Sequence, residues 1–168
     1  MKNKGTRVYK VPLSEDISLV ESMSPLIVES PYQINYIHSY GQDSPFFAGL
    51  TNGKLFGTKC SKCAYTYGTP KAYCMYCGVR CNWIELPLEG RVHTFTVCYY
   101  GSEEFLEETP FVLVLVEWDD VDTLFLSRLL GVDPMKPTLG WIGMKVRTKF
   151  KPLWEMEFKP TDVYFVPA

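Results

Sequence analysis

Histidine is scarce in this sequence, which contains only His38 and His93 among 168 residues. The chain also lacks a glycine-rich phosphate loop, a nucleophile elbow and a His-Glu-x-x-His helix motif. Covalent catalysis by a cysteine, as in a thiolase, needs a base such as histidine beside the nucleophile. We therefore expect that this chain is not catalytic alone and that both histidines are structural.

The nearest candidates for a nucleophile and its base are Cys98 and His93, which lie five residues apart in one predicted strand. In a regular strand, an odd separation places two side chains on opposite faces. We therefore expect that Cys98 and His93 do not pair.

An excess of basic residues is also absent, because 17 lysines and arginines stand against 19 aspartates and glutamates. The formal net charge is −2. Nucleic-acid modules usually carry a basic surface, since the release of phosphate counterions supplies most of their affinity. The charge balance therefore predicts that the chain has no nucleic-acid partner.

Long apolar runs are missing as well. The longest uncharged apolar run, residues 111–116, is far shorter than the ~20 residues that a membrane helix needs, so we expect no membrane span. No apolar secretion segment follows the opening Met-Lys-Asn-Lys-Gly. We therefore expect a cytoplasmic protein with reduced cysteines.

Cysteine, in contrast, occurs in a regular pattern. Two Cys-x-x-Cys pairs, Cys60 with Cys63 and Cys74 with Cys77, are separated by ten residues, which is the spacing of a zinc ribbon. Two such pairs form a tetrahedral four-sulfur site that leaves no position for a substrate, so the metal is predicted to be structural. Its apparent binding free energy, roughly 10–16 kcal/mol, matches the stability of a whole domain, so the segment should unfold without metal.

Two disulfides or chance are the alternatives to a metal site, but disulfides require an oxidising compartment. Two further cysteines, Cys81 and Cys98, remain. Cys81 competes with Cys77 for the fourth ligand position, but only Cys77 is followed by a glycine, Gly78, that allows a tight turn. Cys81 and Cys98 are interpreted as partly buried reduced thiols.

A short amphipathic helix is predicted just before the cysteine pairs. Ser44 is the expected N-cap, Pro45 lies in the first turn, and Asn52-Gly53 is a stop signal. A strand over residues 54–59 should then lead into the first cysteine pair. Four tyrosines near the pairs are expected to shield the metal rather than to contact a ligand: Tyr65, Tyr67, Tyr73 and Tyr76.

The rest of the chain is predicted to be β-structure. Five strand-like stretches occupy residues 91–100, 111–118, 124–130, 145–151 and 163–166, which suggests a five-stranded OB-fold barrel. The predicted architecture is mainly β: an N-terminal arm (1–43), a helix with a rubredoxin-like zinc ribbon (44–88) and an OB-fold domain (89–168). Residues 111–116 are apolar on both strand faces, so the outward face should need a cover.

The fourth of these stretches alternates between apolar and basic residues. Val146, Thr148 and Phe150 should point inward, and the outward row consists of Lys145, Arg147, Lys149 and Lys151. This row could contact phosphates, such as those of coenzyme A. Alternatively, it is a solvated edge strand that lysine protects against aggregation.

Several short motifs follow one another in the order of a known family. They are Pro45-Phe46-Phe47, Cys60-x-x-Cys63, Cys74-x-x-Cys77-Gly78, Trp83, Gly90-Arg91-Val92 and Ile142-Gly143-Met144. In this order, the chain resembles the acyl-CoA-associated family of zinc-ribbon and OB-fold proteins over residues 44–168. The long arm and tyrosine-rich ribbon are similar to the zinc-finger subunits of benzoylsuccinyl-CoA thiolases.

This resemblance implies an accessory subunit of a CoA-thioester enzyme, with the catalytic residues on the partner chain. The implied partner is a thiolase-type acyltransferase or another acyl-CoA enzyme, and the implied ligand of the complex is a coenzyme A thioester. Two other functions stay open. OB barrels also bind single-stranded nucleic acids, and rubredoxin-like electron carriers also use two Cys-x-x-Cys pairs.

Overall fold

The computed structural model describes residues 15–16, 24, 34 and 36–168. The segments of the predicted arm between residues 8 and 33 lie mostly outside this part of the chain. Within the described residues, no helix combines the length and the apolar character needed to cross a membrane.

The predicted helix is present as α1 (Ser44–Thr51), but its N-cap is one residue earlier than expected. Asp43 occupies the N-cap position without a side-chain hydrogen bond, and Ser44 is the first helical residue. The Ser44 hydroxyl instead donates to the carbonyl oxygen of Gly41 at 2.7 Å. Ser44 therefore fixes the 3₁₀ turn η2 (Gly41–Asp43) that precedes the helix.

A small three-stranded antiparallel sheet follows the helix. Its strands are β1 (Phe56–Cys60), β2 (Thr66–Tyr67) and β3 (Cys81–Glu85), in the order β2-β1-β3. The two turns that carry the cysteine pairs lie between β1 and β2 and between β2 and β3. The buried cluster of this sheet is small and consists of Cys60, Tyr67, Cys74 and Cys81.

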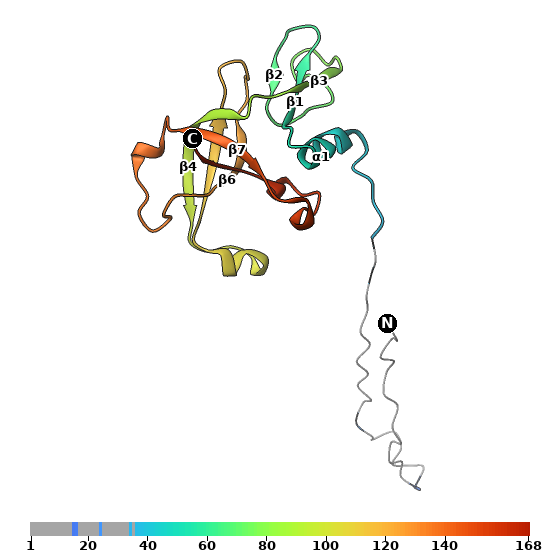
Figure 1. Ribbon diagram of the computed structural model, residues 1–168. Coiled ribbons are helices and arrows are strands. Elements are labelled where there is room, and N and C mark those ends of the chain that lie inside the picture. Colours follow the sequence, from blue (N-terminus) through green and yellow to red (C-terminus); the bar gives the residue numbers. More distant parts are fainter. Residues whose placement is uncertain (1–14, 17–23, 25–33, 35) are drawn as a thin grey trace. The chain divides into compact units, whose positions relative to one another are not determined.

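The five predicted strands of the second half are all present, and they form a closed barrel (Figure 1). The barrel order is β4-β5-β6-β8-β7, with a parallel pair between β6 and β8 and antiparallel pairs elsewhere. This strand order and closure confirm the OB-fold. The strands are β4 (Glu89–Cys98), β5 (Phe111–Glu117), β6 (Phe125–Leu129), β7 (Lys145–Phe150) and β8 (Val163–Pro167).

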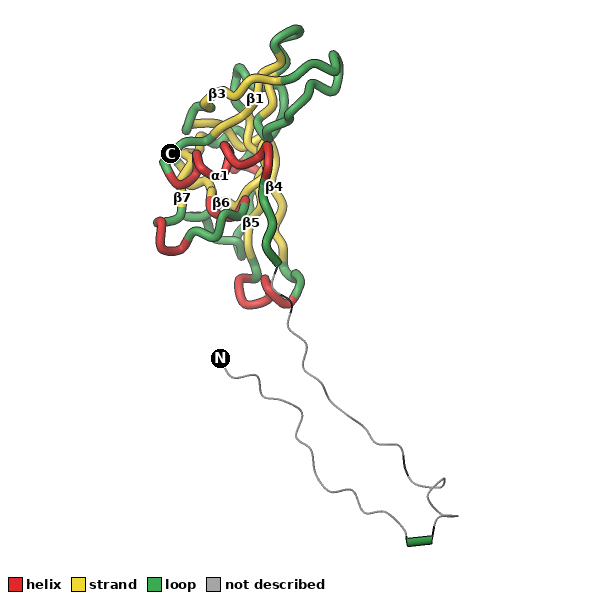
Figure 2. The backbone as a smooth tube through the Cα atoms, turned by 90° about the vertical axis from the view of Figure 1, so that its right-hand side faces the viewer, coloured by secondary structure: helices red, strands yellow, loops and turns green. Residues whose placement is uncertain are grey.

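Short 3₁₀ helices lie in the connections of the barrel. η3 (Glu103–Glu108) joins β4 to β5, and Figure 2 shows it at the far end of those two strands. η4 (Leu139–Trp141) lies between β6 and β7. The connection from β7 to β8 contains two more, η5 (Leu153–Glu155) and η6 (Pro160–Asp162).

Aromatic rings connect the helix to the barrel core. The ring of Phe46 in α1 lies 6.3 Å from the ring of Phe125 at the start of β6. Phe125 in turn contacts the rings of Trp118 and Phe165 at 6.3 and 6.2 Å. All four side chains are buried in one cluster, so α1 packs directly against the barrel interior.

The basic row on β7 lies outward as predicted, with Val146 and Thr148 buried between exposed residues. However, β7 is not an edge strand. It pairs with β8 along its length and with β4 at Lys145–Arg147, so the barrel leaves no open edge for lysine to protect. The edge-strand interpretation of the row is therefore wrong.

A β-bulge at His93 changes the expected relation between His93 and Cys98. Val92 pairs with Val116 and Thr94 with Leu115, so His93 is the extra residue. Beyond the bulge, Phe95 and Val97 face the core, which turns Cys98 outward like His93. The prediction of opposite faces is wrong, but about 16 Å of strand still separates the two residues.

Hydrogen bonds join the ribbon sheet to the barrel. The backbone N–H of Thr66 donates to Asp122 Oδ2 at 2.7 Å, and the N–H of Asp122 donates back to the Thr66 carbonyl at 3.0 Å. The N–H of Gly68 donates to the Thr123 hydroxyl at 2.8 Å. This β2 clasp, formed by Thr66, Gly68, Asp122 and Thr123, fixes β2 to the turn between β5 and β6.

Candidate metal centre

Each cysteine pair lies on a tight turn that ends in a left-handed residue. In the second turn this residue is Gly78, with φ of +66°, as the sequence indicated. The equivalent position of the first turn is Ala64, with φ of +60°, although alanine is disfavoured there by about 1–2 kcal/mol. The sequence gives no sign of this strain, because only glycine marks such a turn at the sequence level.

The two turns bring four sulfur atoms together. The Sγ atoms of Cys60, Cys63, Cys74 and Cys77 all lie within 4.8 Å of one another, and those of Cys63 and Cys74 are 3.6 Å apart. A tetrahedral zinc site with Zn–S bonds of about 2.3 Å requires sulfur atoms about 3.8 Å apart. The cluster is therefore close to the geometry that a zinc ion requires. It is also the one cluster of metal-ligating type within the described residues.

Zinc binds cysteine in the thiolate form. The surroundings favour this form at some of the four cysteines and disfavour it at others. The hydrogen bond from the Tyr67 hydroxyl lowers the pKa of Cys74 to about 6. The backbone N–H of Cys63, which donates to the Cys60 sulfur at 3.4 Å, lowers the pKa of Cys60. In contrast, the hydrogen bond to Cys63 and burial raise the pKa of Cys77 to about 12. A bound divalent cation would supply the positive charge that ionises the remaining thiols.

Tyr67, one of the four tyrosines expected near the metal, also forms a hydrogen bond to a predicted ligand, which its position in the sequence did not indicate. Its hydroxyl donates to Cys74 Sγ at 3.5 Å and accepts from the backbone N–H of Met75 at 3.0 Å. Burial raises the pKa of Tyr67 to about 12, and the hydrogen bond to Cys74 adds to this shift, so Tyr67 stays a donor. Tyr67 therefore orients one predicted ligand and its turn simultaneously.

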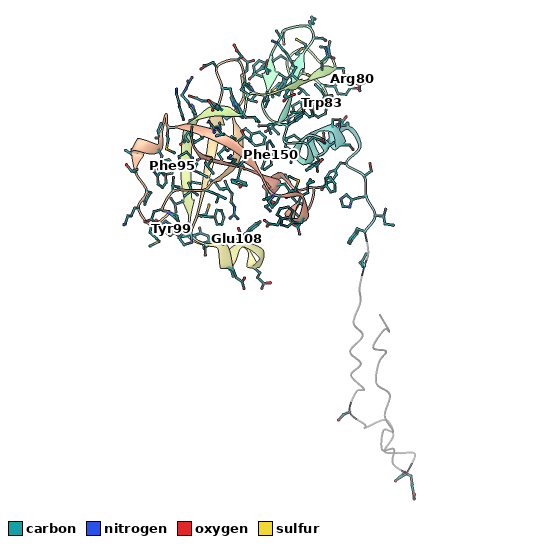
Figure 3. All side chains as sticks on the ribbon, in the orientation of Figure 1. Arg80, Trp83, Phe95, Tyr99, Glu108 and Phe150 are labelled. Atoms are coloured by element: carbon teal, nitrogen blue, oxygen red, sulfur yellow. The ribbon has the colours of Figure 1, made fainter. Side chains whose placement is uncertain are left out.

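The other tyrosines near the cluster divide into two groups. The rings of Tyr65 and Tyr76 lie 4.9 Å apart, and Tyr65 also contacts the Tyr67 ring at 5.0 Å. Tyr65 and Tyr67 pack with the buried cysteines, as expected of shielding residues, whereas Tyr76 is exposed. Tyr73 is also exposed and pairs through its backbone with Arg80. Figure 3 labels Arg80 and Trp83 in this part of the ribbon.

The remaining cysteines lie outside the four-sulfur cluster. Cys81 is buried at the start of β3, where its Cα pairs with that of Cys60, and burial raises the pKa of its thiol. Cys98 lies at the end of β4, opposite Phe111. Cys81 is thus a neighbour of the cluster, and Cys77 takes the fourth position.

The candidate phosphate contacts are on the barrel, on the outward row of β7. Arg147 forms an ion pair with Glu89, with Nη2 and Oε1 2.7 Å apart. Lys145 and Lys149 flank Arg147 on the same exposed face. The cationic row is therefore partly neutralised by β4.

Two family models match the chain. One, described as the rubredoxin-like zinc ribbon domain of ChsH2, matches residues 47–83. The other, described as the C-terminal OB-fold domain of ChsH2, matches residues 83–151. The two matches adjoin one another and include all four clustered cysteines.

Curated relatives include two DUF35 domain-containing scaffold proteins. The relative from Methanocaldococcus jannaschii is 26% identical over 104 residues, which is 60% of this chain and 70% of that protein. The relative from Methanothermobacter thermautotrophicus is 26% identical over 88 residues, which is 51% of this chain and 65% of that protein.

Solved structures with this fold include a chain of the Ltp2-ChsH2(DUF35) aldolase. It matches with a TM-score of 0.57 and 24% identity, over 74% of this chain and 93% of that one. A DUF35 family protein of unknown function from Sulfolobus solfataricus matches with a TM-score of 0.53 and 23% identity, over 74% of this chain and 84% of that one. At these identities, the likeness concerns the fold.

Elemental analysis of the purified protein should find about one zinc per chain, because a closed four-thiolate site binds one ion. Cys63→Ser and Cys74→Ser should lose the metal and the folded ribbon, whereas Cys81→Ser should keep both. Visible absorbance should be absent, which separates zinc from iron. Full zinc content in both ligand variants, or loss only in Cys81→Ser, would show that the assignment is wrong.

Tyr67→Phe should weaken zinc binding by about 10–100-fold, the usual effect of removing a hydrogen bond to a metal ligand. Competition with a chromophoric chelator measures this affinity. Tyr65→Phe is the matched control, because the Tyr65 hydroxyl donates to the Asp122 carbonyl at 3.4 Å rather than to a sulfur. Equal zinc affinities in the two variants would show that the Tyr67 hydroxyl does not support the metal site.

Proposed function

Because the chain belongs to the ChsH2 family of zinc-ribbon and OB-fold proteins, we propose that it is a non-catalytic accessory subunit of a CoA-thioester enzyme. The observation that carries this proposal is the closed four-sulfur cluster, because a metal bound there would have no coordination position for a substrate. Such a metal stabilises the chain and leaves the chemistry to another subunit.

The surroundings of the histidine in the barrel support the same view. His93 Nδ1 lies 2.6 Å from Glu117 Oε2 on the outer face of the barrel, in the middle of β4 and five residues before Cys98. A cysteine nucleophile requires its base within hydrogen-bond reach. Among the described residues, therefore, His93 and Cys98 do not form a nucleophile and base.

The names of the related proteins favour an assembly with an enzyme. Two relatives are scaffold proteins, and one structural neighbour is a chain of an aldolase named for two components. An aldolase breaks the bond between the α and β carbons of a β-hydroxy carbonyl compound, and a thiolase breaks the same bond in a β-keto thioester. We propose a thiolase-type acyltransferase as the partner, in line with the resemblance of the sequence.

Coenzyme A thioester is the proposed ligand of the complex, and the outward row of β7 is the proposed contribution of this chain. Lys145, Arg147 and Lys149 would face the CoA phosphates, with Arg147 exchanging Glu89 for a phosphate oxygen. Exposed ion pairs contribute only about 0.2–1 kcal/mol, so such an exchange costs little.

Deletion of residues 1–40 should release the thiolase-like subunit if the arm supplies much of the contact surface, since permanent complexes commonly bury more than ~2,000 Å². Co-expression followed by size-exclusion chromatography measures this, with zinc content as the control for folding. The isolated full chain should show no thiolase or hydrolase turnover. A full chain that stays monomeric with every such partner, or turnover that Cys98→Ala abolishes, would contradict the accessory role.

Glu89→Gln should increase the affinity of the complex for coenzyme A by up to about fivefold, because it frees Arg147 from an exposed ion pair. Arg147→Ala combined with Lys149→Ala should weaken binding, and the loss should shrink at high salt. Isothermal titration calorimetry measures both effects. Lys136→Ala is the control, because Lys136 is an exposed cation in the connection between β6 and β7. Unchanged affinity in all variants would remove the β7 row from CoA binding.

A further inference from the structure

A hollow of about 330 Å³ lies between the ribbon and the start of α1. Its walls include η2 with the first residues of α1, residues 70–73, and the stretch from Arg80 to Trp83. We call it the ribbon pocket, and Figure 3 labels Arg80 and Trp83 in its wall. Its volume is at the lower end of the ~300–1,000 Å³ that small-molecule sites enclose, so it has room for a few side chains of a partner.

The two cations of the ribbon pocket have no acidic partner. Lys71 and Arg80 are exposed and form no ion pair with any residue that the structure describes. The arginines of the barrel differ, since Arg128 and Arg147, for example, each pair with a glutamate. Asp43 is the one carboxylate in the lining, so two positive charges face one negative charge. The pocket therefore favours an occupant that carries carboxylates.

The ribbon as a whole is basic, although the chain has a net negative charge. Residues 54–88 contain five basic residues and one glutamate, whereas residues 89–168 contain eight basic and thirteen acidic residues. A four-thiolate zinc site would subtract two charges from the ribbon, which still leaves the ribbon positive. An acidic surface of a partner is therefore attracted to the ribbon and repelled by the barrel, which orients its approach.

The ribbon pocket also contains the residue types that contribute most to protein–protein contacts. These types are tryptophan, tyrosine and arginine, and the pocket is lined by Trp83, Tyr73 and Arg80. Trp83 is 38% exposed and Tyr73 is 61% exposed, so both are accessible to a partner. The Trp83 ring lies 6.5 Å from the Phe56 ring in an edge-on arrangement, which restricts its orientation.

Hydrogen bonds within the ribbon fix the wall that carries Lys71. The Thr58 hydroxyl donates to the Lys71 carbonyl and accepts from the Lys71 N–H, both at 2.9 Å. The N–H of Cys81 donates to the Ala72 carbonyl at 2.8 Å. A backbone that is fixed in advance loses less entropy when a partner binds.

We propose that the ribbon pocket binds an acidic segment of the catalytic subunit, with carboxylates facing Lys71 and Arg80 and an apolar part against Trp83. A polypeptide also carries backbone N–H groups that can donate to Asp43, whereas the phosphodiester backbone of a nucleic acid offers acceptors alone. The unpaired cations and the exposed aromatic rings support the chemistry of the occupant. The catalytic subunit as its source rests on the accessory role proposed above.

A selection of displayed random peptides against the full-length, zinc-loaded chain tests the chemistry of the occupant. Enriched peptides should carry an excess of aspartate and glutamate. Fluorescence anisotropy should show about tenfold weaker binding of the most enriched peptide to Lys71→Glu and to Trp83→Ala, with zinc content as the control for folding. Lys136→Glu, an equal charge reversal at an exposed lysine outside the pocket, should bind like the unmodified chain. A failure to enrich acidic peptides, or equal affinity for all variants, would overturn the proposal.

A fluorescent oligothymidylate is the second probe. The unmodified chain should bind it no more tightly than Lys71→Glu does. Binding that Lys71→Glu abolishes and that competes with the selected peptide would assign the pocket to nucleic acid and overturn the proposal.

The same variants in complex with the thiolase-like subunit test the source of the segment. Lys71→Glu and Trp83→Ala should raise the dissociation constant about tenfold, while Lys136→Glu leaves it unchanged. The effect of Lys71→Glu should shrink at high salt, because salt screens exposed charges. A complex whose dissociation constant is the same in all variants would overturn the catalytic subunit as the occupant while the accessory role stands. A chain that selects acidic peptides but never binds the subunit would overturn the accessory role and support the chemistry of the pocket.

Discussion

The Sγ atoms of four cysteines lie within 4.8 Å of one another, and as thiolates they would repel unless a cation lay among them. Without a metal, the Cys77 thiol is protonated at neutral pH, because its hydrogen bond to Cys63 and its burial raise its pKa to about 12. The ribbon sheet includes a strand of only two residues, β2, and cannot supply a compensating core. We therefore expect the fold of this half to depend on metal binding.

Ion pairs between acidic and basic side chains are a feature of the barrel surface. Arg147 on β7 is paired with Glu89, and Arg128 on β6 is paired with Glu108. An OB-fold that binds a single strand relies on cations along its groove, so these pairings weigh against a nucleic-acid partner. The closed metal cluster and the paired arginines support the accessory role proposed above.

Much of this architecture could be predicted because it is local. Cysteine spacing identified the two turns, and all five barrel strands are runs of β-branched and aromatic residues bounded by loop signals. The bulge at His93, the left-handed Ala64 and the hydrogen bond from Tyr67 to Cys74 could not be predicted. Each depends on contacts between segments or on strain that neighbouring structure maintains.

The β2 clasp has a consequence for the order in which the protein matures. Thr66 and Gly68 are next to the first cysteine turn, and their hydrogen bonds to Asp122 and Thr123 hold the turn between β5 and β6. A chain that has not acquired its metal would therefore lack this brace on the barrel as well as an ordered ribbon. Zinc supply would then act as a checkpoint during biosynthesis, so that only metal-loaded copies reach the assembly step.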